Sequence, residues 1–138
     1  MEIALHNTHP DINLEEETVT ELVRKVSRDL SLKMASCTVI CTDDTLISDL
    51  HNTYFNDPDT TDVITFDLGE DAVEGEIYVC VDQAARQAKE FGVSTPNEIR
   101  RLIIHGLLHL AGYDDREEAD RREMKELENR LYGQTPSW

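Results

Sequence analysis

Two histidines spaced four residues apart, His105 and His109, lie in the apolar segment 102–111. Residues at this spacing share one face of an α-helix and lie about 6 Å apart along its axis, so both imidazoles can reach one metal ion. Gly112 can end such a helix in a left-handed turn, after which the chain carries Asp115. Two imidazoles and one carboxylate leave room for water at the metal, as in catalytic zinc sites.

A structural role for the same residues is the alternative. A histidine on an apolar helix face can be a hydrogen-bonded core residue. The segment Asp115–Glu118 also has the spacing of a helix N-cap with its reciprocal acid, and Asp114 could cap equally well, three residues before Glu117. The pattern alone leaves both interpretations open.

Length and composition predict a single domain spanning residues 1–138. We expect no membrane span, because no apolar run approaches 18 residues, and no signal peptide, because the N-terminus lacks a basic and then apolar region. The three cysteines, Cys37, Cys41 and Cys80, form neither an even set nor a C-x-x-C pair. This pattern favours buried thiols and a cytoplasmic location.

The charge distribution limits how a polyanion could approach. The chain has 13 basic and 29 acidic residues, a net charge of −16, and residues 34–85 contain no Lys or Arg. Basic residues return beside the histidine segment, at Arg86, Lys89, Arg100 and Arg101. An RNA partner would be repelled by most of the surface and would have to approach through this basic group. The alternative is an acidic surface that only maintains solubility.

The remaining pattern predicts four strands and five helices. Alternating or β-branched segments predict strands at 2–7, 36–41, 61–66 and 75–81. Helical spacing and capping signals predict helices from 11–14 to about 32, at 46–54 and 82–91, from a capping box at Thr95–Glu98 through 111, and from 116 to about 132. We therefore expect an α+β (mixed α/β) fold, in which a four-stranded mixed sheet is packed by about five helices and a turn follows the metal-site helix.

Three sequence blocks resemble those of a known family. His105-Gly-Leu-Leu-His-Leu-Ala-Gly-Tyr-Asp-Asp115 is similar to His-Gly-x-Leu-His-Leu-x-Gly-Tyr-Asp-His of the YbeY family, bacterial single-strand-specific endoribonucleases that act in rRNA maturation. Thr61–Phe66 resembles the family's Thr-Asp-Val-Leu-Ser-Phe, and Gly75–Val79 resembles its Gly-Asp-Ile-x-Ile strand. Met124 lies where the family has a methionine in its final helix.

The resemblance implies one divalent metal, Zn²⁺, held by His105, His109 and Asp115. Asp115 replaces the family's third histidine, which lowers the charge of the site by one unit. A set of two histidines and one carboxylate also suits Fe(II) and other divalent ions. A second departure is the pair Tyr54–Phe55, because Phe55 stands where the family has an arginine, a natural ligand for phosphate.

The function implied by the resemblance is metal-dependent endoribonucleolytic cleavage in rRNA maturation and ribosome biogenesis. The implied partners are single-stranded rRNA and the small ribosomal subunit or its assembly factors, with no membrane partner, and we expect a monomer. Candidate ligands for the flanking phosphates are the four basic residues beside the histidine segment, and His51 could line the same cleft. The resemblance does not indicate which residue acts as general base.

Two other functions compete with this one. A non-catalytic ribosome assembly factor could use the metal only to fix the helix to the following turn. A metallopeptidase is the other alternative, but its His-Glu-x-x-His helix supplies a glutamate as general base, and Gly106 occupies that position here.

Overall fold

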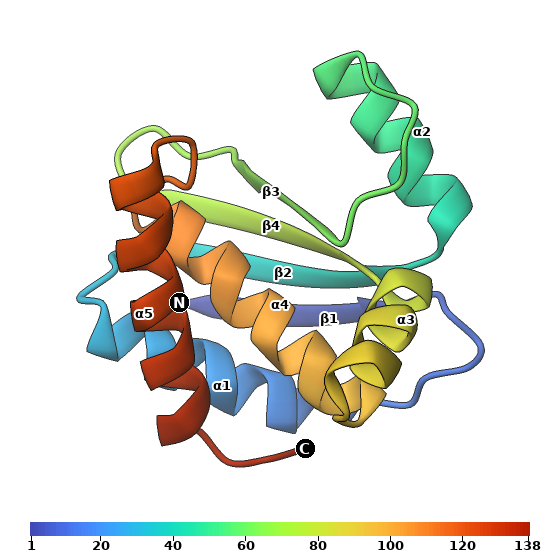
Figure 1. Cartoon of the computed structure of the whole chain (residues 1–138). Helices are drawn as coiled ribbons and strands as arrows, with labels where there is room; N and C mark the ends of the chain where they lie inside the picture. Colours follow the sequence, from blue (N-terminus) through green and yellow to red (C-terminus); the bar gives the residue numbers. More distant parts are fainter.

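Four strands form one mixed sheet in the order β1–β2–β4–β3 in the computed structural model, which describes residues 1–138 (Figure 1). The strands are β1 (Glu2–Asn7), β2 (Met34–Thr42), β3 (Val63–Asp67) and β4 (Val73–Cys80). β1, β2 and β4 are parallel, and β3 is an antiparallel edge strand paired with β4. All four strands end within two residues of their predicted limits.

Five helices accompany the sheet: α1 (Glu16–Asp29), α2 (Asp44–Phe55), α3 (Val81–Phe91), α4 (Thr95–Leu110) and α5 (Glu118–Gln134). The α+β class, the four-stranded mixed sheet and the number of helices predicted from the sequence are thereby confirmed. None of the helices is long and apolar enough to cross a membrane.

The starts of α4 and α1 differ from those predicted. Ser94, rather than Thr95, caps α4, because its hydroxyl accepts a hydrogen bond from the backbone N–H of Asn97 at 3.2 Å. α1 begins later than predicted because the residues before it form a loop, in which the Asn7 side chain donates to the carbonyl of Ile12 at 2.8 Å. Both differences come from local hydrogen bonds that apolar periodicity does not reveal.

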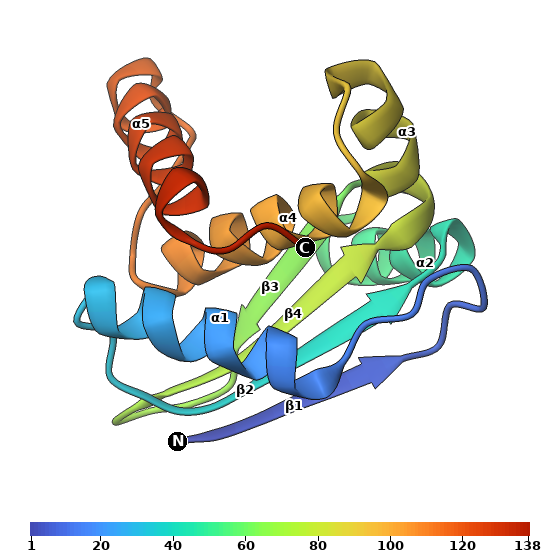
Figure 2. The ribbon, with the colours of Figure 1, turned by 90° about the horizontal axis from the view of Figure 1, so that it is seen from below.

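The main core lies between the sheet and the helices α1 and α4, which cover the same face (Figure 2). Alternate strand residues such as Val39 and Ile77 point into it and are fully buried. Ile103 and Leu107 of α4 are fully buried in the same cluster. Burial of each such side chain contributes about 1.5–3 kcal/mol, so α4 is fixed to the sheet along most of its length.

The opposite face of the sheet is covered only near β3 and β4. There α2 packs through Ile47, which clusters with Ile64 and Cys80. Cys37 and Cys41 are buried free thiols on the main core side, as predicted, and burial raises the pKa of the Cys37 thiol to about 12. They act as small apolar residues.

Gly106 brings α4 close to the sheet. A Cβ atom at this position would lie 2.9 Å from the Cγ2 atoms of both Ile77 and Thr65. The side of α4 at Gly106 therefore faces β3 and β4, while His105 and His109 are half-buried on a different side of the helix. A glutamate at position 106 would clash with the sheet, which argues against a metallopeptidase of the His-Glu-x-x-His type.

We predict that Gly106→Ala destabilises the protein. The added methyl group overpacks the contact with Ile77 and Thr65, and overpacking costs about 1–3 kcal/mol, which exceeds the gain of about 1 kcal/mol in helix propensity. Gly133→Ala in α5 is the matched control, because a Cβ there meets no atom within 4 Å. Urea unfolding should show a lower midpoint for Gly106→Ala and an equal or higher one for Gly133→Ala. An unchanged midpoint for Gly106→Ala would contradict the close packing.

Candidate metal centre

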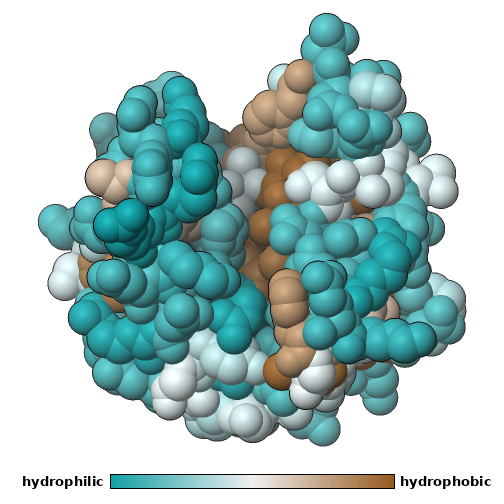
Figure 3. All heavy atoms as spheres, in the orientation of Figure 1, coloured by the Kyte–Doolittle hydropathy of each residue, from teal (hydrophilic) through white to brown (hydrophobic).

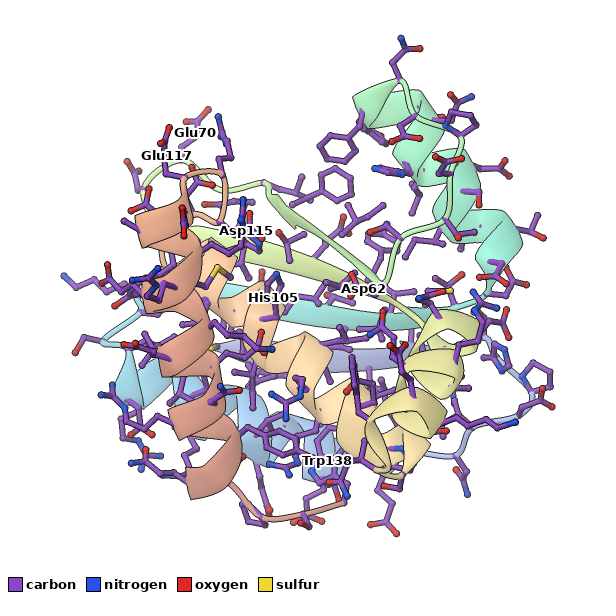
Figure 4. The ribbon with its side chains drawn as sticks, in the orientation of Figure 1. Asp62, Glu70, His105, Asp115, Glu117 and Trp138 are labelled. Atoms are coloured by element: carbon purple, nitrogen blue, oxygen red, sulfur yellow. The ribbon has the colours of Figure 1, made fainter.

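The C-terminal half of α4 and the turn after it bring His105, His109 and Asp115 together. The two Nε2 atoms lie 3.1 Å apart. The Oδ2 atom of Asp115 lies 3.7 Å from Nε2 of His105 and 3.6 Å from Nε2 of His109. The three residues predicted as metal ligands from the sequence therefore present one atom each to a common point. Figure 4 labels two of them, His105 on α4 and Asp115 on the turn that follows it.

The turn after α4 returns the chain toward the histidines. Gly112 has a φ of +99°, which L-residues rarely adopt. Its N–H donates to the carbonyl of His109, and the N–H of Tyr113 donates to the carbonyl of Leu108, each at 3.0 Å. These two bonds are those of a Schellman motif, so Gly112 ends the helix as the sequence predicts.

Asp114 stabilises the next turn and leaves the Asp115 carboxylate free of backbone contacts. Oδ1 of Asp114 accepts hydrogen bonds from the N–H groups of Asp115 at 2.7 Å and Arg116 at 3.1 Å. α5 therefore begins at Glu118 rather than at the predicted 116, and its N-cap residue is Glu117, whose side chain makes no capping bond. Capping by Asp115, the structural alternative raised by the sequence, is thus wrong.

Both imidazoles are oriented by an acceptor on their other nitrogen. Nδ1 of His105 lies 2.7 Å from Oε1 of Glu128, and Nδ1 of His109 lies 3.1 Å from the carbonyl oxygen of Tyr113. An acceptor at Nδ1 places the proton there and leaves the Nε2 lone pair available. A carboxylate or carbonyl behind each histidine is typical of metal-ligating histidines.

Glu128 is the site residue that the sequence analysis missed. Its side chain is only 5% exposed and lies on the inner face of α5 between Met124 and Leu131, which are buried four residues before and three residues after it. A charged residue that continues an apolar stripe was the available signal, but α5 is so rich in acidic residues that Glu128 did not stand out.

Hydrogen bonds keep Glu128 ionised despite its burial. Burial alone would raise the pKa of its carboxyl, but the hydrogen bonds from His105 and from Lys125, whose Nζ is 3.0 Å away, lower it to about 2. For His105, burial acts to lower the pKa, and the hydrogen bond to Glu128 together with nearby carboxylates outweighs burial and raises it. The His105–Glu128 contact is therefore a charge-assisted hydrogen bond.

The donor set and its spacing fit a tetrahedral metal ion. Ligand atoms 2.0–2.1 Å from a zinc ion lie about 3.3–3.4 Å from one another, close to the three distances seen here. Two imidazoles and a carboxylate are ligands that zinc accepts, and three protein ligands leave a position for water or substrate. The half-exposed Asp115 can adjust to close the remaining few tenths of an ångström.

A second group of donor atoms, Asp44, Cys80 and Asp82, does not fit a metal as well. Both carboxylate oxygens of Asp44 accept from the Arg86 guanidinium, at 2.8 and 3.0 Å. Oδ1 of Asp82 is hydrogen-bonded to Nε2 of His9 at 2.8 Å, and burial raises the pKa of the Cys80 thiol to about 12. These groups form an internally satisfied polar network.

A cavity of about 250 Å³ adjoins the metal centre between α3, α4 and α5. Figure 3 shows the molecule hollowed at this position, with apolar surface exposed along the hollow. The cavity is lined by polar groups of both signs and a few apolar ones: Asp62, Gln87, Phe91, Glu98, Arg101, Leu102, His105, Asp115, Arg121, Met124, Lys125 and Glu128. A second hollow of about 290 Å³ adjoins His109 and includes His51 and Phe55.

The structure corrects the predicted group of basic residues. Only Arg101 of that group lines the cavity. Arg100 is buried and donates to the carbonyl of Tyr132 at 2.7 Å, Arg86 is paired with Asp44, and Lys89 is exposed without lining either hollow. The basic residues beside the site come instead from α5, where Arg121 and Lys125 lie one helical turn apart.

Comparisons with known proteins agree with this geometry. The family "Endoribonuclease YbeY" matches residues 4–135. The chain belongs to the YbeY family. Family relatives named endoribonuclease YbeY include those of Salinibacter ruber (31% identity, 92% of this chain, 87% of the relative) and Acholeplasma laidlawii (35% identity, 95% and 94%). The solution structure of TM1509 from Thermotoga maritima matches with a TM-score of 0.62 and 27% identity, over 97% of this chain and 91% of that one.

The similarity to the YbeY family thus extends well beyond the three sequence blocks from which it was predicted. The matched region begins in β1 and includes α1 and β2, where the sequence pattern predicted only compatible strands and a helix. In this family member, Asp115 supplies the third donor atom, and Phe55 lines the hollow on the His109 side.

We predict that Glu128→Gln weakens metal binding. The amide has only one acceptor oxygen, so it cannot accept hydrogen bonds from His105 and Lys125 on separate oxygens as the carboxylate does. His105 then loses the partner that orients it and raises its basicity. Loss of such a partner typically lowers metal affinity by 10–100-fold. Glu126→Gln, an exposed change two residues away, is the control. Competition with a chromogenic zinc chelator gives both affinities. Equal affinities for the two variants would show that Glu128 does not support the site.

Proposed function

We propose that this chain is a metal-dependent, single-strand-specific endoribonuclease that acts in rRNA maturation and ribosome biogenesis. The observation that carries the proposal is the convergence of Nε2 of His105, Nε2 of His109 and Oδ2 of Asp115 beside an open cavity. Membership in the YbeY family supports the same chemistry. We assign a cytoplasmic setting, single-stranded rRNA as substrate, and the small ribosomal subunit or its assembly factors as partners.

The three ligands define the chemistry that the site can support. A zinc ion held there would supply a Lewis acid for a phosphoryl oxygen and a water of lowered pKa as nucleophile. Glu128 and the carbonyl of Tyr113 keep both Nε2 atoms directed at the same point. Because Glu128 lies on α5 and Tyr113 lies in the turn held by its hydrogen bond to Leu108, the ligands need little rearrangement to bind the ion.

The walls of the cavity supply the groups that hold the substrate. Arg101, Arg121 and Lys125 line it, and phosphates prefer such partners. Nε of Arg121 donates to the carbonyl of Asp115 at 3.2 Å, which holds its guanidinium next to a ligand residue. The family has an arginine at the position of Phe55. We propose that Arg101, Arg121 and Lys125 bind the flanking phosphates in its place.

Asp62 is our candidate for the proton acceptor. It lies just before β3, faces the same cavity as His105, and its carboxylate makes no hydrogen bond within the protein (Figure 4). Asp115 and Glu128 are less suited, because one is a metal ligand and the other is paired with His105 and Lys125. A free carboxylate in reach of the reacting water is what general-base catalysis requires.

We predict that cleavage of an unstructured RNA oligonucleotide at low salt requires both the metal and His109. Zinc-loaded protein should cut the oligonucleotide, and chelator treatment or His109→Ala should reduce the rate by at least about 100-fold, because two ligands cannot hold the ion. His6→Ala, an exposed change on β1, is the control and should retain full activity. Binding of RNA without cleavage, with any divalent metal supplied, would favour the non-catalytic assembly factor instead.

We also predict that Asp115→His preserves metal binding. A third imidazole is neutral and suits the same ion, and the affinity should stay equal or rise. The side chain at position 115 is 42% exposed, so the larger ring can be accommodated. Isothermal titration with zinc measures the change. A collapse of affinity would show that the turn does not direct position 115 at the histidines.

A further inference from the structure

Glu98 has a buried carboxylate oxygen without a partner at the cavity beside the metal centre. The residue is 1% exposed and lines the cavity from α4. Its Oε2 accepts a hydrogen bond from Nε2 of Gln87 at 2.7 Å, but Oε1 has no hydrogen-bond partner. The nearest cation is Arg101, whose Nε lies 3.7 Å from Oε1.

An unsatisfied buried acceptor of this kind indicates a position where a ligand could donate a hydrogen bond. A buried polar atom left without a hydrogen bond is unfavourable, and more so when it is charged. Burial also raises the pKa of the Glu98 carboxyl, although the hydrogen bond from Gln87 acts in the opposite direction. This direction is expected for a buried carboxyl with few hydrogen-bond donors around it. Nothing in the proposed metal chemistry uses this group.

The position of Glu98 relative to the metal centre suits a nucleotide. Glu98 precedes His105 by seven residues on α4, so the two lie on one face of the helix about 10 Å apart along its axis. Both line the same cavity. A nucleotide whose phosphate lies at the metal centre can place the hydrogen-bonding edge of its base near Glu98.

The other lining groups are those that recognise a single-stranded base. Phe91 is 58% exposed at the end of α3 and offers an aromatic face for stacking. Gln87 lies beside Glu98 and holds its Oε2, and Lys125 is a cation for the backbone. The volume of about 250 Å³ lies below the range of about 300–1,000 Å³ for drug-sized ligands, so it suits a single base.

We propose that this cavity is a nucleobase subsite in which Glu98 accepts N–H groups from a guanine of single-stranded RNA, next to the cleaved phosphate. Guanine presents two adjacent donors, N1–H and the 2-amino group, and a carboxylate is purely an acceptor. Uracil presents one N–H between two carbonyl oxygens, which a carboxylate repels. The inference rests on the proposed function, because it assumes that RNA passes the metal centre.

Binding of mononucleotides tests the subsite without any need for activity. ¹⁵N-labelled, zinc-loaded protein is titrated with guanosine and uridine 5′-monophosphates while the side-chain amide signals of Gln87 are followed. We expect guanosine monophosphate to shift these signals and to bind at least about tenfold more tightly than uridine monophosphate. Equal affinities, or binding that leaves the Gln87 signals unchanged, would overturn the proposal.

Glu98→Gln should abolish the preference for guanosine monophosphate, because the amide is both donor and acceptor. Glu90→Gln removes the same charge from an exposed position of α3 outside the cavity lining, and should keep the preference. If Glu98→Gln does not fold, Phe91→Ala replaces it. Loss of the stacking face should then weaken guanosine monophosphate about tenfold. An unchanged preference in a folded Glu98→Gln, or unchanged affinity in Phe91→Ala, contradicts the proposal.

Mapping of cut sites separates this inference from the proposed function. Wild-type protein acting on an oligonucleotide pool should leave guanine enriched at one position next to the cut, and Glu98→Gln should remove the enrichment while still cutting. Cleavage without any base preference would overturn the subsite and leave the nuclease function standing. Selective binding of guanosine monophosphate without RNA cleavage would overturn the nuclease function and leave the subsite standing.

Discussion

The buried hydrogen bond between His105 and Glu128 connects the two helices that build the candidate metal centre. It joins α4 to α5, places the His105 proton on Nδ1, and leaves Nε2 directed at His109 and Asp115. Such a contact is costly to break from one side, because an ionised carboxylate whose side chain is 5% exposed would lose a hydrogen-bond donor. The geometry of the site therefore depends on how α5 packs.

The sheet fixes the other half of the arrangement. Gly106 allows α4 to approach β3 and β4 closely, which sets the rotation of the helix and so the side on which His105 and His109 emerge. The Schellman turn at Gly112 then reverses the chain, and Asp114 provides the backbone hydrogen bonds that leave Asp115 free. Packing at one glycine and a turn at the other together place three side chains at one point.

The sequence predicted what local spacing can encode. His105 and His109 could be paired because residues four apart meet on any helix, and Asp115 because a glycine turn returns the chain. Glu128 and Glu98 could not be assigned, since their roles arise where separate helices meet. Arg100 was a plausible surface cation by composition, but tertiary packing buries it against the C-terminal segment. Loop hydrogen bonds likewise set the start of α1.

X-ray absorption spectroscopy of the zinc-loaded protein tests the central claim most directly, because it identifies the atoms around the ion. We expect two imidazole nitrogens at about 2.0–2.1 Å from the ion, with oxygen donors in the remaining positions and no sulfur. A sulfur shell at about 2.3 Å would place the ion at Cys80 instead. That result, or a spectrum with fewer than two imidazoles, would contradict the assignment of His105, His109 and Asp115.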